Sequence, residues 1–276
     1  MRALIALVLF AVPVLAGAEE CRYHADRNFD LDAAGLRSVA LQLGSSDLVL
    51  EGVPGLKRVE VRGKACASDP KWLDGLTVQQ HRSGDRLDIA VDRRDRGIHL
   101  SLFGSSYAYV DLHVRVPAEL AAAVNSGSGD VEANGVAALD FDSGSGDLRA
   151  RAIAGALTLR LGSADVEADD VGSVDLRSTG SGDVHVDGVR GNVDAGRSGS
   201  GDLRFRHVRG NVRVQSTGSG DVEAGDVGGD VWVGSTGSGD VSVDGVRGSF
   251  TVESTGSGDV SHRGVAGKIS VPRERD

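Results

Sequence analysis

Large aromatic side chains are scarce in this chain of 276 residues, which holds 2 Trp, 3 Tyr and 6 Phe. Any hydrophobic core must therefore be built mainly from valine, alanine and leucine. Proline is also rare, with 5 residues, whereas glycine reaches 40, about twice its ordinary usage. Collagen would need glycine at every third position, and disorder would need fewer apolar residues than the 40% present. The chain is therefore expected to fold, with glycine required at particular positions.

Basic residues are too few for a nucleic-acid-binding protein. Lys and Arg total 30 against 40 Asp and Glu, which gives a formal net charge of −10. Binding to phosphate backbones depends on clustered Lys and Arg. No nucleic acid partner is expected.

Long apolar runs are absent after the first residues. Residues 3–17 are apolar, follow a basic M-R start, and end in A-G-A at residues 16–18, a pattern typical of a secretory signal peptide. This run is short for a membrane span, and no later segment is long enough to cross a bilayer. The sequence predicts a signal peptide at residues 1–18 and an exported acidic protein without a membrane span, located in the periplasm, outside the cell or at its surface.

Cysteine occurs only twice, at Cys21 and Cys66. In an oxidising compartment two such residues most simply form one disulfide. The bridge would close a loop of about 45 residues and contribute ~4 kcal/mol in the chain-entropy model. A redox or metal-binding pair is the alternative, but the spacing matches no ligand pattern.

An internal repeat dominates the second half of the chain. The phrase G-S-G-D-V, with small variations, recurs eight times, and its aspartates are separated by 17, 18, 18, 19, 19, 19 and 19 residues. A weaker copy, G-S-S-D-L, begins at Gly44. The repeat aspartates are Asp130, Asp147, Asp165, Asp183, Asp202, Asp221, Asp240 and Asp259.

Alternation within each unit predicts strands. In the unit that starts at Asp183, Val184 and Val186 alternate with polar residues, and glycines follow; a period of two with glycine punctuation is typical of β-strands. When the units are aligned, columns of valine and leucine alternate with columns that vary freely. This pattern predicts stacked coils around a narrow core, in which each coil contacts only its neighbours.

The predicted fold is all-β: a single-stranded β-solenoid (β-helix) of about eight 17–19-residue coils with an irregular β-rich N-terminal cap. We assign residues 19–119 to the cap and the irregular first coils, 120–271 to the regular solenoid and 272–276 to a polar C-terminal tail. Each coil is expected to hold two or three short strands. The recurrent glycines, among them Gly218, are expected at corners that need positive φ and bring adjacent backbones close.

The serine and aspartate columns have two interpretations. Their side chains can hydrogen-bond nearby backbone N–H groups and hold the corner. Alternatively, stacked carboxylates repel one another and could bind calcium, which prefers oxygen ligands. The calcium candidates are Asp183, Asp202, Asp221, Asp240 and Asp259. The period differs from that of the calcium-binding nonapeptide repeat, and no cofactor is otherwise expected.

A third column, four residues before each aspartate, carries Ser or Thr in seven of the eight units and Leu161 in the other. On flat solenoids such hydroxyl ladders can organise ice or polysaccharide, but this ladder is interrupted.

The repeated G-S-G-D-V units, the segment Y-V-D-L-H-V-R-V-P at residues 109–117 and the leader together resemble a bacterial family. That family is a domain of unknown function with β-strand repeats, described as a putative adhesin. The resemblance covers residues 38–271 and implies the repeat fold. It implies no catalytic residues, because none are established for the family.

The sequence favours a non-catalytic exported solenoid, an adhesin-like binding or structural protein of the cell envelope whose partner is an envelope component, a glycan or another protein. One alternative is a polysaccharide-acting β-helix enzyme, which would need carboxylates clustered on one face. The other is a calcium-dependent binding module. No motif names the ligand or the oligomeric state.

Overall fold

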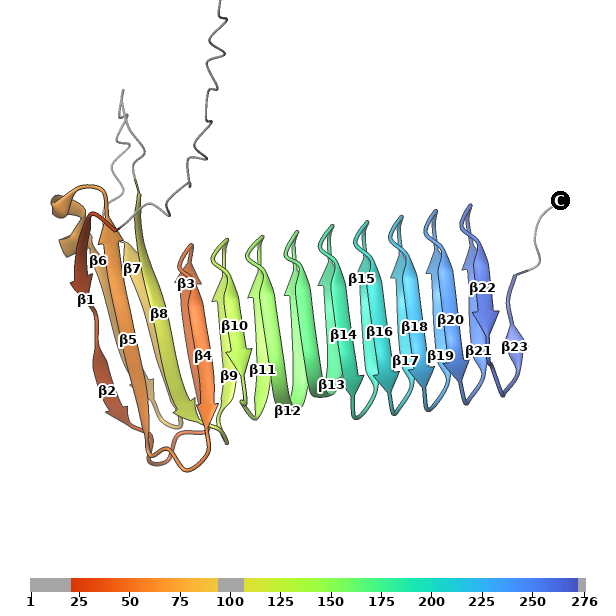
Figure 1. The fold of residues 1–276 in the computed structure, drawn as a ribbon, viewed down its shortest axis with the longest axis horizontal. Coiled ribbons are helices and arrows are strands. Elements are labelled where there is room, and N and C mark those ends of the chain that lie inside the picture. The colour runs from red at the N-terminus through yellow and green to blue at the C-terminus, as the bar shows by residue number, and fades with distance from the viewer. Residues whose placement is uncertain (1–20, 94–106, 273–276) are drawn as a thin grey trace, which may run out of the picture.

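The computed structural model describes residues 21–93 and 107–272. The predicted signal peptide and most of the predicted C-terminal tail lie outside the described residues. The described chain forms a β-solenoid of about eight turns behind an N-terminal cap (Figure 1).

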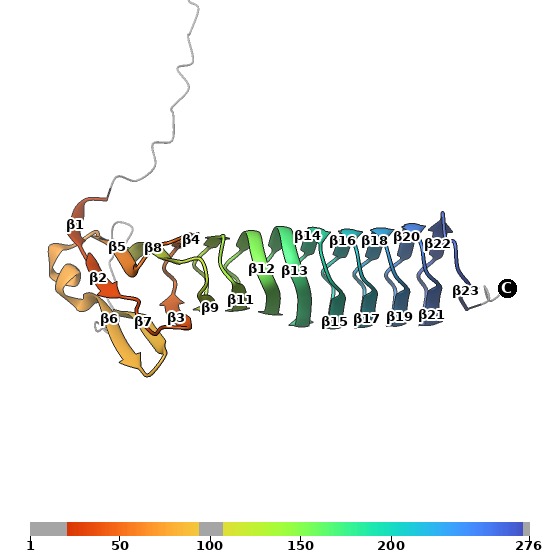
Figure 2. The ribbon, with the colours of Figure 1, turned by 90° about the horizontal axis from the view of Figure 1, so that it is seen from below.

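Each coil contributes one stretch of strand to each of two sheets of parallel strands, which appear as two rows in Figure 2. The long strands β12 (Leu148–Leu161) and β13 (Val166–Thr179) each pass from one sheet to the other. The first sheet contains, in spatial order, β8 (Ala108–Pro117), β4 (Leu48–Val53), β10 (Val131–Asn134), the first part of β12 and of β13, β14 (Val184–Val189), β16 (Leu203–Val208), β18 (Val222–Val227), β20 (Val241–Val246) and β22 (Val260–Arg263).

The second sheet contains β7 (Arg86–Arg93), β3 (Ser38–Gly44), β9 (Ala121–Ser126), β11 (Ala138–Ser143), the second part of β12 and of β13, β15 (Val193–Ser198), β17 (Val212–Thr217), β19 (Val231–Thr236), β21 (Phe250–Thr255) and β23 (Ile269–Ser270). The all-β solenoid predicted from the repeat is thus confirmed, with two strands in each coil.

The core lies between the two sheets and follows the apolar columns of the repeat. Val184 and Val186 of β14 point inward because alternate residues of a strand face opposite sides of its sheet, and Val189 is buried on the same side after the left-handed Gly188. All three are at most 1% exposed. The phenylalanines of the solenoid, Phe141, Phe205 and Phe250, are fully buried among these valines. The core is a narrow column, so every coil depends on its neighbours for burial.

The weak copy of the repeat at Gly44 is a complete coil of the solenoid. Its strands β3 and β4 pair in parallel with β9 and β10, although about 70 residues separate the two coils in the sequence. The intervening segment folds back to form most of the cap. Placing this coil required the three-dimensional structure, because the inserted segment interrupts the period.

Antiparallel strands close the N-terminal end. In the first sheet β5 (Arg58–Ala67) pairs with β8 and is itself covered by β1 (Tyr23–Asp26) and β2 (Phe29–Asp32). In the second sheet β6 (Leu76–Ser83) pairs with β7, and a 3-10 helix, η1 (Pro70–Gly75), precedes it. These strands occupy the backbone edge that the first coil would otherwise expose.

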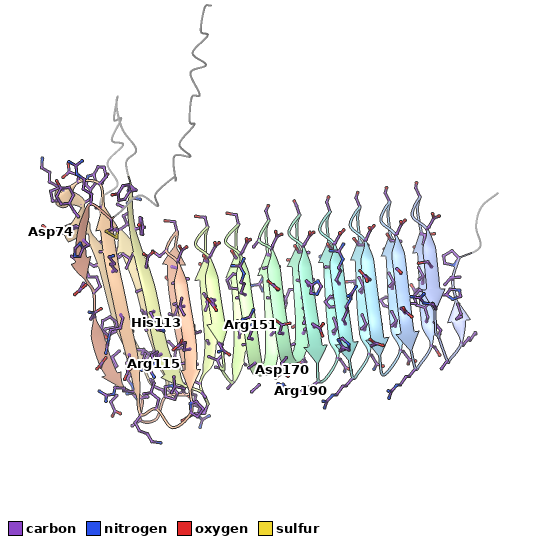
Figure 3. All side chains as sticks on the ribbon, viewed as in Figure 1. Asp74, His113, Arg115, Arg151, Asp170 and Arg190 are labelled. Atoms are coloured by element: carbon purple, nitrogen blue, oxygen red, sulfur yellow. A yellow bond between two sulfur atoms is a disulfide. The ribbon has the colours of Figure 1, made fainter. Side chains whose placement is uncertain are left out.

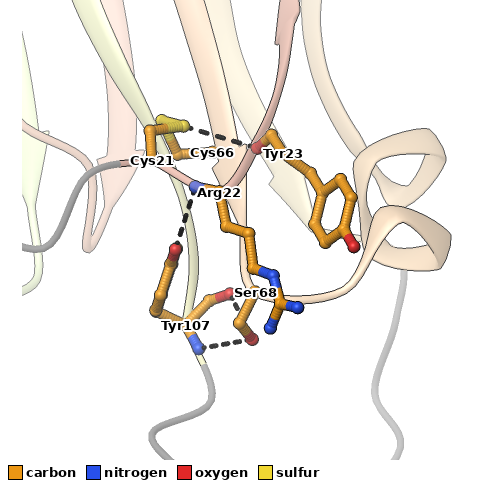
Figure 4. Close-up of a disulfide and its surroundings, with 6 residues drawn as sticks. All are labelled: Cys21, Arg22, Tyr23, Cys66, Ser68 and Tyr107. Atoms are coloured by element: carbon orange, nitrogen blue, oxygen red, sulfur yellow. Dashed lines mark hydrogen bonds between the residues drawn. A yellow bond between two sulfur atoms is a disulfide. The ribbon is translucent and has the colours of Figure 1, made fainter.

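A disulfide joins Cys21 to Cys66, as predicted, with a Cα–Cα distance of 5.5 Å (Figure 4). Cys66 is buried in β5, so the bridge holds the start of the described chain against the cap. Nearby, the Arg22 backbone N–H donates to the Tyr107 hydroxyl at 3.1 Å, and Ser68 bonds the Tyr107 backbone. These contacts fasten β1 to the strands beneath it.

The coil length varies because two positions of the coil can each hold one more residue. Between Ile153 and Ala156 of β12 the pairing with β13 slips by one residue, at the turn from the first sheet to the second. Between Leu159 and Arg160 it slips again, inside the second sheet. The coil of 17 residues lacks both extra residues, those of 18 have one, and those of 19 have both. The apolar columns therefore stay in register throughout.

The glycines at the G-S-G corner do not adopt the positive φ that the sequence suggested. Of the first glycine column only Gly44 has positive φ (64°). The requirement is instead one of space, because a Cβ on Gly218 would lie 2.5 Å from the carbonyl oxygen of Gly199 in the preceding coil. The expected close approach of adjacent backbones is therefore what fixes glycine here.

Positive φ occurs in a different column, five residues after each repeat aspartate. Its members lie at the end of each first-sheet strand and take φ values of 52–76° whether or not they are glycine. They are Gly135, Ala152, Asp170, Gly188, His207, Asp226, Gly245 and Gly264. Left-handed backbone at a side-chain-bearing residue is costly, but Asp and His tolerate it better than most.

These two columns give a prediction for stability. Gly218→Ala should destabilise the fold by about 2 kcal/mol, because the new methyl group would overlap a backbone carbonyl. Gly245→Ala should cost about 1 kcal/mol or less, since φ of 72° is close to that of Ala152 and the atom nearest the new Cβ belongs to a side chain. Thermal melts followed by circular dichroism would measure both, and equal melting temperatures would contradict the steric explanation.

Candidate binding surfaces

The aspartate column forms a continuous hydrogen-bond ladder along the G-S-G edge, the edge where the chain passes from the second sheet to the first. In every step one carboxylate Oδ1 accepts the backbone N–H of the aspartate in the next coil, at 2.8–3.0 Å. The ladder begins at Asp47, which belongs to the weak copy of the repeat. The carboxylates therefore join successive coils, and this bonding offsets part of the repulsion between neighbours about 4.8 Å apart.

The ladder bears on the calcium interpretation. Asp183, Asp202, Asp221 and Asp240 each use Oδ1 to accept a backbone N–H, and Asp259 is the last in the series. Within residues 21–93 and 107–272 no group of three or more His, Cys, Asp or Glu side chains is placed to hold a metal ion. The geometry favours hydrogen bonding, and calcium binding remains a hypothesis to be tested.

The hydroxyl column faces inward. Thr179, Thr217 and Thr236 are 4–5% exposed, and each hydroxyl donates to the carbonyl of the second glycine of its own G-S-G corner, at 2.7–3.1 Å. These side chains therefore tie the corner from within and cannot contact ice or polysaccharide. Where Leu161 replaces the hydroxyl, Ala164 replaces that glycine, and both side chains are buried.

The serines of the G-S-G corner are exposed along the same edge. Ser181, Ser200 and Ser219 are members of this row, and their hydroxyls have no hydrogen-bond partner among the described residues. The role expected for them, bonding within the corner, belongs instead to the hydroxyls four residues before each aspartate. The edge thus presents outward a row of serine hydroxyls beside the carboxylate ladder.

A second ladder runs along the opposite edge, where the chain passes from the first sheet to the second. Asn192 Oδ1 accepts the Asn211 N–H at 2.9 Å, Asn211 Oδ1 accepts that of Asp230 at 2.8 Å, and Asp230 Oδ1 accepts that of Ser249 at 2.7 Å. Sequence reasoning missed this column because Asn, Asp and Ser alternate in it. The signal was present as a short acceptor side chain directly before each valine of the second sheet.

The outer face of the first sheet carries charges that alternate between coils. Arg204 and Arg206 both bind Glu223 in the next coil, at 3.2 and 2.6 Å, and Arg263 binds Asp244 at 2.6 Å. The hydrogen bond from Arg206 lowers the pKa of Glu223, and that from Arg263 lowers the pKa of Asp244. These exposed pairs add little stability individually, but they neutralise much of the face.

The same alternation of charges extends to the cap and to the edge where the chain passes from the first sheet to the second, which we call the lower edge (Figure 3). His113 and Arg115 of β8 contact Glu51 of β4, at 3.3 and 3.6 Å, and Arg151 of β12 lies 3.5 Å from Asp169. At the lower edge Arg190 pairs with Asp170, the left-handed residue of the preceding coil, and also donates to backbone carbonyls of β12. Most carboxylates on this surface are therefore matched with a cation.

One histidine lies between carboxylates. His207 Nδ1 is 2.7 Å from Asp187 Oδ1, and His207 Nε2 is 3.4 Å from Asp226 Oδ2. Among the described residues this group comes nearest to the acid–base cluster that a polysaccharide-acting enzyme would need. It lies on an open edge with all three side chains exposed to solvent, so nothing there excludes water from a reacting group.

Trp232 lies on the outer side of the second sheet and contacts residues of both neighbouring coils. The Arg213 guanidinium carbon lies 3.7 Å from the centre of its ring, and Trp232 Nε1 donates to Glu253 Oε1 at 3.1 Å. These contacts give Trp232 a structural role in the second sheet. Arg197, in β15 of the same sheet, is exposed and has no side-chain partner in the part of the chain described.

A carboxyl group with a raised pKa lies at the start of the ladder. Asp111 occupies the ladder column of β8, beside Asp47. Partial desolvation raises the pKa of Asp111, and the negative charge of Asp47 raises it further, although Lys64 opposes both effects. The charged form of Asp111 is therefore disfavoured by folding.

Comparison with known proteins identifies the family. The family model for the Toastrack DUF4097 domain matches residues 71–225, more than half of the chain. The chain belongs to the Toastrack DUF4097 family. The matched residues include β6–β8 of the cap and the solenoid as far as β18. No curated protein matches the sequence.

Several solved structures match this Toastrack chain over most of its length. A putative lipid binding protein from Parabacteroides distasonis matches with a TM-score of 0.52 and 15% identity, over 91% of this chain and 97% of the other. A putative cell adhesion protein from Clostridium sporogenes matches with a TM-score of 0.32 and 12% identity, over 91% and 100%. A putative adhesin from Bacteroides fragilis matches with 0.34 and 11%, over 91% and 98%. At these identities the likeness concerns the fold alone.

Among the described residues of this Toastrack chain, no helix is both long enough and apolar enough to cross a bilayer.

The ladder interpretation predicts how Asp221 responds to substitution. Asp221→Asn should leave the melting temperature within about 1–2 °C, because an amide oxygen can accept the Asp240 N–H just as Asn192 accepts that of Asn211 on the other edge. Asp221→Ala should cost about 1 kcal/mol, since the acceptor is lost, which corresponds to roughly 2–4 °C for a chain of this size.

Melting curves of the unaltered protein in EDTA and in millimolar calcium provide the complementary measurement. Coincident curves are expected if the carboxylates serve hydrogen bonding alone. A calcium-dependent rise in melting temperature that Asp221→Asn abolishes would establish the calcium-binding interpretation instead.

The raised pKa of Asp111 predicts a pH dependence. A carboxyl whose pKa is higher in the folded state binds its proton more tightly there, so stability falls as pH rises through the range between the unfolded and folded values. Asp111→Asn should therefore raise the melting temperature slightly at pH 7, and the gain should disappear at pH 3. Asp194→Asn, at an exposed carboxylate of β15, is the control. If the melting temperature at pH 7 rises no more than in the control, the charged form of Asp111 does not destabilise the fold.

Proposed function

We propose that the protein is an exported, non-catalytic binding module with an adhesin-like role in the cell envelope. The observation that carries this proposal is how the regular columns are used. The aspartate and asparagine columns bond one coil to the next, the hydroxyl column ties each corner from within, and the charged columns form ion pairs between coils. The repeat thus builds a long, rigid lateral surface in which the side chains that could act as acids and bases are occupied by structural bonds.

Export is supported by two independent features. The first residues have the pattern of a signal peptide, and the two cysteines are joined in a disulfide. Disulfides persist in oxidising compartments and are rare in the cytosol. The family supports a shared fold, and the proposed role depends on the surface of this chain.

A sedimentation assay tests the proposal. The disulfide-bonded protein is mixed with washed bacterial envelope fractions and spun down. Two controls are run alongside: a reduced and heat-unfolded sample, and a blank with buffer in place of the envelope fraction. Retention of the folded protein above both controls is expected. Treatment of the envelope with protease or with periodate beforehand shows whether the partner is protein or glycan.

No retention by any envelope fraction would overturn the proposed function. Release of shortened saccharides from the envelope during incubation would instead favour the enzyme. That release would have to depend on the folded state to count as catalysis by this protein.

A further inference from the structure

The lower edge of the solenoid contains a pocket of about 700 Å³ that the structural columns do not use. Two columns of the repeat line it over three successive coils. The left-handed column contributes His207, Asp226 and Gly245, and the column two residues further along contributes Arg209, Gly228 and Arg247. We call this the arginine pocket.

Two glycines create the space in the pocket. Gly228 lies between Arg209 and Arg247 in their column, and successive coils are about 4.8 Å apart. The two arginines are therefore roughly 10 Å apart at the backbone, with no side chain between them. Gly245 leaves a second gap beside Asp226. In the coil before the pocket, the column of Arg209 and Arg247 holds Arg190, which forms an ion pair with Asp170.

The two arginines differ from those on the outer face of the first sheet. Those on the first sheet are engaged by acids of neighbouring coils, as Arg151, Arg204 and Arg206 show. Neither Arg209 nor Arg247 has a hydrogen-bond or ion-pair partner for its side chain within the described residues. Each therefore keeps five N–H donors available for a ligand. In a chain with a net charge of −10, two adjacent unpaired cations are a local exception.

The pocket also contains a carboxylate that can accept hydrogen bonds. His207 Nε2 lies 3.4 Å from Asp226 Oδ2, and His207 Nδ1 is in turn 2.7 Å from Asp187. The other oxygen, Asp226 Oδ1, is directed over Gly245, where a Cβ would lie 3.1 Å from it. One carboxylate oxygen is thus presented toward the gap, available to accept hydrogen bonds from hydroxyl groups.

This combination of groups indicates the ligand class. Guanidinium groups bind carboxylates through paired N–H donors, and the Asp226 carboxylate can bind sugar hydroxyls while it repels dense anions such as polyphosphate. From these contacts we infer that the arginine pocket binds a saccharide that bears carboxylates, a uronic acid chain. The inference rests on the proposed binding function and names its ligand. Four of the pocket residues, Asp226, Gly228, Gly245 and Arg247, lie beyond the family match at residues 71–225.

Calorimetric titration with oligogalacturonate tests the inference. The unaltered protein should bind it, more weakly as salt rises, and should bind neither the methyl-esterified oligomer nor polyphosphate of similar length with comparable affinity. Arg209→Gln and Arg247→Gln should each weaken binding by roughly tenfold or more, as expected for a lost charge-assisted bond. Arg197→Gln removes the same charge from an exposed, unpaired arginine close to the opposite edge and should change the affinity less than twofold. Melting temperatures of all three variants should match that of the unaltered protein.

The outcomes separate this inference from the proposed function. Absence of binding to oligogalacturonate, with retention by envelope fractions preserved, would overturn the uronic acid assignment and leave the proposed function in place. An equal loss of affinity in Arg197→Gln would also overturn it, because binding would then follow net charge rather than the pocket. Tighter binding of polyphosphate would show that the ligand class is wrong. If the unaltered protein shows neither retention by envelope fractions nor binding to oligogalacturonate, both the uronic acid inference and the proposed function are overturned.

Discussion

The fold depends on the close approach of successive coils at their corners. Parallel strands one coil apart are held about 4.8 Å from each other, so at the G-S-G edge a backbone carbonyl of one coil lies where a Cβ of the next would be. Glycine meets this constraint at the corner, and short acceptors meet it beside the corner, because an Asp or Asn side chain just reaches the next backbone N–H. This reach explains why the residues that accept these bonds have short side chains. The regularity of the sequence follows from this spacing more than from any ligand.

Much of the solenoid could be predicted because its cause is periodic. Columns of Val, Leu and Ala identified the inward face, and the corresponding residues are buried, as Val184 and Val222 show. The disulfide followed from the presence of two cysteines alone. The glycine corners were placed correctly but explained wrongly, because close packing between coils produces the same glycine column as positive φ would. The true left-handed column was hidden, since Gly188, His207 and Asp226 share no chemistry and only the backbone shows what they have in common.

The first coil shows a different limit of sequence reasoning. Residues 38–53 stack directly on the coil that begins at Ala121, and the cap is inserted between them. A repeat search detects G-S-S-D-L at Gly44 but cannot tell whether it is a coil or a relic, because the neighbour that completes it is distant in the chain. The hydroxyl column was similarly ambiguous, since an exposed ladder and a buried one have the same spacing. Only burial separates them, and Thr217 at 5% exposure belongs to the core.

These constraints also indicate where function can reside. A column that must satisfy the backbone of the next coil cannot change without loss of stability, so it carries little information about a ligand. Positions whose side chains make no such bond can vary from coil to coil. The edge opposite the G-S-G corners holds several of these positions, and one column there contains Arg, Gly and Ala. A glycine there removes a side chain without breaking a ladder, because the bond to the next coil is made by the neighbouring Asn or Asp. The solenoid can therefore open a pocket such as that at Gly228 at small cost in stability, and the identity of the flanking residues then determines what the pocket binds.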